Sequence, residues 1–128
     1  MYFYKVVYGL ENKYYSYLAN YSRPLIDLSS KYVLEYKVGE WTYPKIKNSK
    51  LFMFASYQAA ETYKGEFTHV FLCEAKNPTW AALMLLFTKV SDASVEKWWA
   101  GNEGAYCNKV PEHTKYADAI KILEEVYA

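Results

Sequence analysis

The chain of 128 residues has the length of one domain, and its formal net charge of +1 is too small for nucleic-acid binding that depends on bulk electrostatics. Its only arginine is Arg23, which leaves almost no guanidinium groups for bidentate recognition of phosphates or base edges. The longest apolar run, residues 80–87, is far shorter than the roughly 20 residues of a membrane-spanning helix. From the length we expect one domain over residues 1–128. The first residues lack the basic start of a signal peptide, so we expect a cytoplasmic protein without a membrane partner.

The first 30 residues predict a hairpin followed by an irregular segment. Residues 2–8 are rich in β-branched and aromatic side chains, which is typical of a strand, and residues 14–18 are a plausible hairpin partner. Residues 25–30 are expected to form a loop or a short helical turn.

The next segment alternates between apolar and polar side chains. Residues 32–38 predict a strand with Leu34, Tyr36 and Val38 on one face. A turn at 39–40 follows. Residues 41–43 could pair with a neighbouring strand, and Pro44 should end that hydrogen-bond ladder because it has no N–H to donate.

A strand and a helix are predicted over residues 51–65. The apolar run 51–54 is typical of a buried central strand. Ser56 is a good helix N-cap, residues 57–64 suit a helix, and Gly65 stands where a C-cap glycine belongs.

The second half is less regular. Residues 67–75 predict another strand, and residues 80–90 suit either a buried helix or a strand. A short helix is expected over 92–100. Residues 115–127 again fit both a helical stripe and a strand. The fold class we predict is therefore α+β, a compact, mainly antiparallel, strongly bent sheet with two or three short helices packed on it.

No residues form a catalytic or metal signature. The only histidines, His69 and His113, have no second ligand at metal spacing, so we expect no metal site and no cofactor. The cysteines, Cys73 and Cys107, are expected to be reduced thiols, with Cys73 acting as a small buried hydrophobe. As a general base, His69 would need a partner brought near it by the fold.

The aromatic residues are the most unusual part of the composition. Tyr, Phe and Trp number 15, 6 and 4, and aromatic residues make up 20% of the chain. Trp41 and Tyr43 follow a turn, where they either fold back on the core or form the rim of a binding cleft. The tyrosine excess favours rings that line a polar cleft or an interface.

Four segments resemble a pattern of small uncharacterised phage and prophage proteins. They are residues 36–44 (YKVGEWTYP), 51–54 (LFMF), Ala60 and 117–123 (ADAIKIL). In those proteins a related segment precedes an apolar strand and an alanine-bearing helix, and the closing segment favours a strand. The resemblance spans most of the chain and implies a phage setting, but it names no activity.

A narrower segment is similar to the strand-to-helix element of ADP-ribosyltransferase folds. Residues 51–56 (LFMFAS), followed by Ala60 and Tyr63, match the aromatic strand and the helix that flank the nicotinamide pocket there. Met53 stands where the polymerase type has its pocket tyrosine, and no late catalytic glutamate can be assigned. The resemblance therefore implies a nucleotide-sized cleft more than NAD cleavage.

The leading hypothesis is a non-enzymatic phage-type accessory protein that binds a small ligand, such as a nucleotide, or a host protein through an aromatic cleft. A counter-defence role in the host cytoplasm is one version of it. The predicted binding residues, with no catalytic residue among them, are Trp41, Tyr43, Ser56, Tyr57, Tyr63 and His69. The alternatives are an ADP-ribosyltransferase-like enzyme using Tyr57, Tyr63 or His69, and a homo-oligomeric structural or interaction protein.

Overall fold

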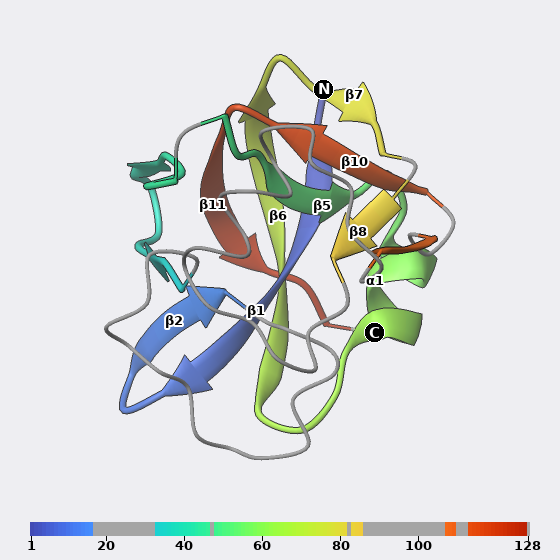
Figure 1. Cartoon of the computed structure of the whole chain (residues 1–128). Coiled ribbons are helices and arrows are strands. Elements are labelled where there is room, and N and C mark those ends of the chain that lie inside the picture. The colour runs from blue at the N-terminus through green and yellow to red at the C-terminus, as the bar shows by residue number, and fades with distance from the viewer. Residues whose placement is uncertain (17–32, 47, 82, 86–106, 110–112, 128) are drawn as a thin grey trace.

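The structure is a computed structural model that describes residues 1–16, 33–46, 48–81, 83–85, 107–109 and 113–127 (Figure 1). Its centre is β1, residues Phe3–Leu10, which pairs along its length with β6, Thr68–Lys76. On its other side β1 pairs with β5, Leu51–Phe54, near its start and with β2, Lys13–Ser16, near its end. All of these pairs are antiparallel.

Short strands extend the sheet on both sides of this centre. β3 (Glu35–Tyr36) pairs with β2, and β11 (Ala119–Glu125) pairs with β6. Likewise, β10 (Thr114–Ala117) pairs with β5, and β7 (Thr79–Trp80) pairs with β10. β4 (Trp41–Thr42) pairs with the outer side of β11. A separate two-stranded sheet contains β8 (Leu83–Leu85) and β9 (Cys107–Lys109).

Asp118 is the single residue between β10 and β11, and it bends the sheet. Its backbone N–H donates to the carbonyl oxygen of Lys76 at 2.9 Å. β10 pairs with β5, and β11, which follows after one residue, pairs with β6. β5 and β6 lie on opposite sides of β1, so the chain crosses from one side of the sheet to the other between β10 and β11. This crossing makes the sheet curl around one of its faces, which we call the inner face.

The main hydrophobic core fills the inner face. Side chains from β1, β3, β5, β6, β10 and β11 meet there, and the fully buried ones include Val7, Met53, Cys73, Ile120 and Ile122. Alternation along each strand sends the intervening side chains to the outer face. There, α1 (Tyr57–Tyr63) covers a smaller cluster formed by Val6, Phe54, Ala60 and Val70.

The sheet prediction is confirmed in its coarser form, and the helix content is not. The described residues form a mainly antiparallel sheet with one helix, α1, so this part of the chain is mainly β rather than α+β with two or three helices. The helix expected over 92–100 and the segment 25–30 lie outside the described residues. Residues 115–117 belong to β10 and 119–125 to β11, where the buried Ile120 and Ile122 alternate with the partly exposed Lys121 and Leu123 as in a strand.

Two local predictions were wrong. Gly65 does not cap α1: the cap is Lys64, in an extended conformation, and its N–H donates to the carbonyl of Ala60. Of the strand predicted over 32–38, residue 32 lies outside the described part, only Glu35–Tyr36 of the rest is regular, and Val38 is 52% exposed. The chain turns there because Gly39 adopts a φ of 81°, and the N–H of Gly39 donates to Ile122 of β11.

Candidate functional site

Trp41 and Tyr43 lie at the open edge of the sheet, on its outer face. The register of β4 against β11 places Trp41 opposite Lys121, and Lys121 in turn lies opposite Glu74 of β6. Tyr43 follows two residues later on the same side of the chain, and it is 53% exposed. The predicted Trp41–Tyr43 pair thus lies on the surface and not in the core.

Lys76, the last residue of β6, joins the two rings. Its Nζ lies 4.6 Å from the ring centre of Trp41 and 5.1 Å from that of Tyr43, distances typical of cation–π contacts. The same nitrogen donates a hydrogen bond of 2.6 Å to the Tyr43 hydroxyl oxygen. Lys121 Nζ lies 5.0 Å from the Trp41 ring centre. We call Trp41, Tyr43, Lys76 and Lys121 the lysine–aromatic surface.

The two lysines of this surface differ in their charge environment. Lys121 Nζ lies 3.4 Å from a carboxylate oxygen of Glu74, which offsets part of its charge. Within the described part of the chain, Lys76 has no carboxylate within salt-bridge distance. The positive charge of Lys76 is therefore held in place by a ring and a hydroxyl, and no carboxylate of the described residues neutralises it.

The neighbouring carboxylate of Asp118 is already engaged. It forms an ion pair with Lys50 and accepts a hydrogen bond of 2.8 Å from the side-chain amide of Asn77. The hydrogen bonds from Lys50 and then from Asn77 lower the pKa of Asp118. Asp118 consequently fixes the backbone of Lys76 without pairing with its ammonium group.

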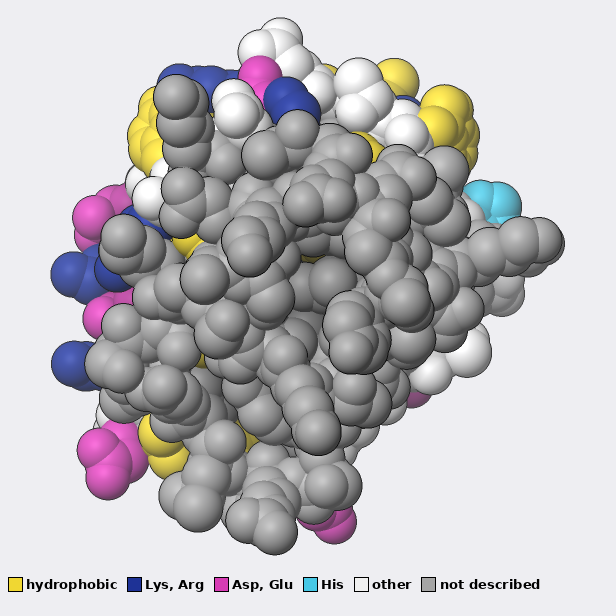
Figure 2. All heavy atoms as spheres, viewed as in Figure 1, with side chains coloured by type: hydrophobic (Ala, Val, Ile, Leu, Met, Phe, Trp, Pro, Cys, Tyr) yellow, Lys and Arg dark blue, Asp and Glu magenta, His cyan; other side chains and the backbone are white. Residues whose placement is uncertain are grey.

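A further lysine–aromatic contact is found on the described surface. In Figure 2, hydrophobic and Lys or Arg side chains of described residues adjoin one another along the upper rim. Trp80 contributes to the exposed aromatic area, being 64% exposed, and Lys115 Nζ lies 4.3 Å from the centre of its indole ring. Lysine stacked on an aromatic ring is thus a repeated arrangement in this protein.

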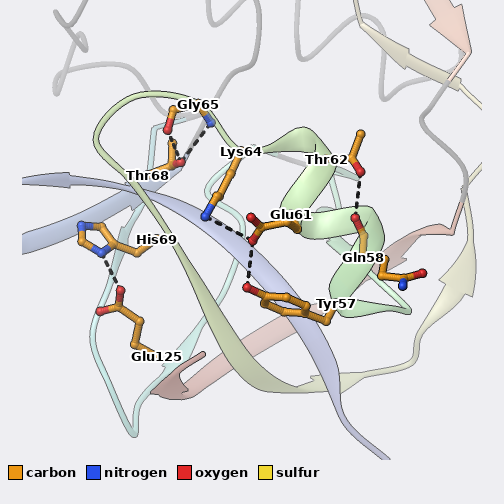
Figure 3. A network of polar contacts seen from close by, with 9 residues as sticks. All are labelled: Tyr57, Gln58, Glu61, Thr62, Lys64, Gly65, Thr68, His69 and Glu125. Atoms are coloured by element: carbon orange, nitrogen blue, oxygen red, sulfur yellow. Dashed lines mark hydrogen bonds and ion pairs between the residues drawn. The ribbon is translucent and has the colours of Figure 1, made fainter. Parts of the chain in front are cut away.

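Ser56 and Tyr57 stabilise helix α1 rather than an open site. The Ser56 hydroxyl accepts from the N–H of Ala59 at 3.2 Å, as an N-cap does. The Tyr57 hydroxyl donates to Glu61 at 2.8 Å, and Lys64 Nζ lies 3.1 Å from the same carboxylate oxygen (Figure 3). The bond to Glu61 raises the pKa of Tyr57, and the bonds from Tyr57 and Lys64 lower the pKa of Glu61.

The rings of the helix pack on the outer face of the sheet. The Tyr63 ring centre lies 5.1 Å from that of Phe54, and Tyr57 meets Tyr4 edge-on at 5.9 Å. Both geometries are ordinary for aromatic pairs in a core. These contacts assign Tyr57 and Tyr63 to the packing of α1.

His69 lies on the inner face of β6. Its Nδ1 is 2.8 Å from a carboxylate oxygen of Glu125, and the edge of Tyr14 meets the imidazole with ring centres 5.4 Å apart. Tyr127 also bonds to Glu125, and this bond raises the pKa of Tyr127. The fold thus supplies His69 with the carboxylate that its sequence neighbours lack.

The six predicted binding residues therefore occupy three places. Trp41 and Tyr43 share the lysine–aromatic surface, while Ser56, Tyr57 and Tyr63 belong to α1. His69 is on the opposite face of the sheet, because it alternates with Val70, which lies under the helix. Figure 3 shows the His69–Glu125 pair apart from the α1 network, with ribbons between them.

The functional candidates that the sequence did not point to are lysines. Lys76 and Lys121 both occupy outward positions of alternating strands, but their meeting with Trp41 depends on the strand order. Lys5 is only 8% exposed, its Nζ donates to the carbonyl of Phe52 at 2.7 Å, and burial lowers its pKa to about 8. Its position between apolar neighbours of a regular strand was the only available signal.

Searches of the described residues for metal sites and membrane-spanning helices, and of known proteins for similar ones, gave negative results. Among the described residues, no group of three or more His, Cys, Asp or Glu could hold a metal ion. No helix in the described ranges is long and apolar enough to cross a membrane. Comparison with protein-family models, with curated proteins and with solved structures gave no match.

Proposed function

We propose that this is a non-enzymatic binding protein that holds a small anionic ligand on the lysine–aromatic surface. The observation that carries the proposal is the position of Lys76, whose ammonium group is ordered by a ring and a hydroxyl yet has no carboxylate partner in the described chain. An ordered, unneutralised cation attracts an anion at little further entropic cost for its own side chain.

The hydrogen-bonding pattern supports the same conclusion. Lys76 donates to the Tyr43 oxygen, so the Tyr43 proton is directed elsewhere and the ammonium keeps two further N–H groups. The two donor atoms are 2.6 Å apart, which suits two oxygens of one carboxylate or phosphate group. The rings beside them add apolar area for the rest of a ligand.

The phage resemblance supplies the biological setting of the proposal. In that setting the protein is an accessory factor in the host cytoplasm, and sequestering a nucleotide signal of bacterial immunity is the concrete version we favour. With Arg23 as the only arginine, phosphate binding has to depend on lysines and hydroxyls. Lys76 and Tyr43 provide one group of each kind.

A thermal-shift screen followed by calorimetry tests the proposal. We expect at least one compound from a set of nucleotides, cyclic nucleotides and aromatic carboxylates to raise the melting temperature, and Lys76→Met and Tyr43→Phe to abolish that shift. Lys13→Met is the matched control, because Lys13 is an exposed lysine on β2. Binding that ignores Lys76 and Tyr43, or no binding by any compound or by a protein from host lysate, would reject this surface as the site.

The enzymatic alternative has one supporting observation, the His69–Glu125 pair, in which a carboxylate orients an imidazole as it does for a general base. Incubation with labelled NAD tests it, with nicotinamide release or labelled protein as the positive result. His69→Gln should then abolish the reaction. An unchanged rate in that variant would remove His69 from the chemistry.

A further inference from the structure

We infer that the ligand of the lysine–aromatic surface is a monoanionic phosphodiester joined to a planar ring, as in a cyclic nucleotide. The inference rests on the proposed function and adds the charge and shape of the ligand. It follows from three features of the surface: its net charge, the direction of its donors and its exposed ring.

The two lysines of the surface and the neighbouring Glu74 together carry a formal charge of +1. Both ammonium nitrogens lie about 5 Å from the centre of the Trp41 ring, so Lys76 and Lys121 are less than about 10 Å apart. Glu74, which is 42% exposed in its side chain, offsets the charge of Lys121. Among the described residues, no carboxylate pairs with Lys76, and its positive charge matches one negative charge on the ligand.

Glu74 also sets an upper limit on the charge of the ligand. Its carboxylate is paired with Lys121, and Lys121 lies beside the same indole as Lys76. A second negative charge on the ligand would add repulsion from this carboxylate, and the described residues beside Trp41 offer no further unpaired cation to offset it. A phosphomonoester, which carries nearly two charges at neutral pH, is therefore disfavoured relative to a phosphodiester.

The donors and the ring fix the shape of the ligand. Lys76 Nζ uses one N–H to bond the Tyr43 oxygen, so its other N–H groups and the Tyr43 O–H are adjacent donors that point away from this bond. Together they can bond the two free oxygens of one phosphodiester. Tyr43 is 53% exposed, and Lys76 Nζ contacts it at its hydroxyl end, which leaves the face of the ring available. A base attached near the phosphate can stack on the remaining ring surface, an interaction that accepts any base.

Calorimetric titration with 3′,5′-cyclic AMP, AMP and adenosine tests this inference. We expect the cyclic nucleotide to bind about tenfold more tightly than AMP, and adenosine to bind most weakly, because it lacks the anion. Lys76→Met should lower the affinity for cyclic AMP about tenfold or more, whereas Lys13→Met should leave it unchanged. Glu74→Gln should raise the affinity for AMP several-fold and reduce the difference between the two nucleotides.

The outcomes separate the two proposals. Tighter binding of AMP than of cyclic AMP would overturn the charge rule, and so would an equal loss of affinity for both nucleotides in Glu74→Gln. If that binding still depends on Lys76, the lysine–aromatic surface remains the binding site. If neither nucleotide binds but an aromatic carboxylate of the thermal-shift set does, the phosphodiester assignment is overturned and the surface remains an anion site. Binding of neither nucleotide would overturn the inference, and the proposed function falls with it only when no compound of the thermal-shift set and no protein from host lysate binds in a Lys76-dependent way.

Discussion

The imidazole of His69 lies directly against the backbone of Gly9. A Cβ added at position 9 would lie 2.7 Å from Nε2 and 2.9 Å from Cδ2 of His69, closer than such atoms approach in proteins. The N–H of Gly9 also donates to the carbonyl of Phe67 at 2.7 Å, so the backbone has little freedom to move away. The absence of a side chain at Gly9 therefore permits the His69–Glu125 pair.

Gly9→Ala should displace the His69 ring and break its contact with Glu125. We expect a loss of about 1–3 kcal/mol in the free energy of unfolding, measured by urea denaturation. The same substitution in a His69→Ala background should cost much less, because the clash is with the ring itself. An equal cost in both backgrounds would mean that the methyl group introduced at position 9 clashes with backbone rather than with His69.

Burial of Lys5 makes a pH-dependent contribution to stability. The pKa of Lys5 falls from 10.5 to about 8, mainly because burial disfavours the charged amine, so the unfolded chain binds more protons than the native protein between these values. The cost is complete below pH 8, where it amounts to roughly 3 kcal/mol, and it is relieved as the pH rises towards 10.5.

Lys5→Met should consequently stabilise the protein at pH 7 by about 1–2 kcal/mol, since the lost hydrogen bond to Phe52 offsets part of the gain. The stability difference between variant and wild type should shrink as the pH rises from 8 to 10, and urea denaturation at a series of pH values measures it. Lys13→Met, at an exposed position, is the control and should show no such trend. A constant difference would show that the Lys5 amine stays hydrated.

Much of the fold was predictable because short strands carry local signals, whereas the site depends on long-range register. Alternating apolar side chains and a well-placed Ser56 predicted the strands and the start of α1. Lys76 reaches Trp41 only because β11 lies between β6 and β4, an order that no local pattern encodes. The phage and transferase resemblances stay predictions.

The errors have physical causes of the same kind. Val38 continues the apolar alternation of Leu34 and Tyr36, yet the turn at Gly39 and its hydrogen bond to β11 take precedence. The sheet separates His69 from Tyr57, two of the predicted binding residues, because neighbouring positions of β6 face opposite sides.

The N-cap of α1 offers a prediction about local stability. Ser56→Ala removes the acceptor for the Ala59 N–H and should lower the free energy of unfolding by about 1 kcal/mol, because α1 has only seven residues and few bonds of its own. Ser56→Asp, which keeps an acceptor, should restore most of that stability. If both variants lose stability equally, the hydroxyl at position 56 has a role other than capping.

The thiol of Cys73 should be almost unreactive in the native protein. Its side chain is fully buried beside Ile122 and Val7 in the main core, and burial raises its pKa to about 12. The thiolate is the reactive form, so a rise of the pKa from 9 to about 12 alone lowers the reactive fraction near pH 8 roughly a thousandfold.

In a Cys107→Ser variant, where Cys73 is the only thiol, an aromatic disulfide reagent should react rapidly in denaturant and extremely slowly without it. The slow rate should also track urea concentration, because reaction then requires unfolding of the sheet. Fast labelling of the native variant would show instead that solvent reaches the inner face between β1, β6 and β11.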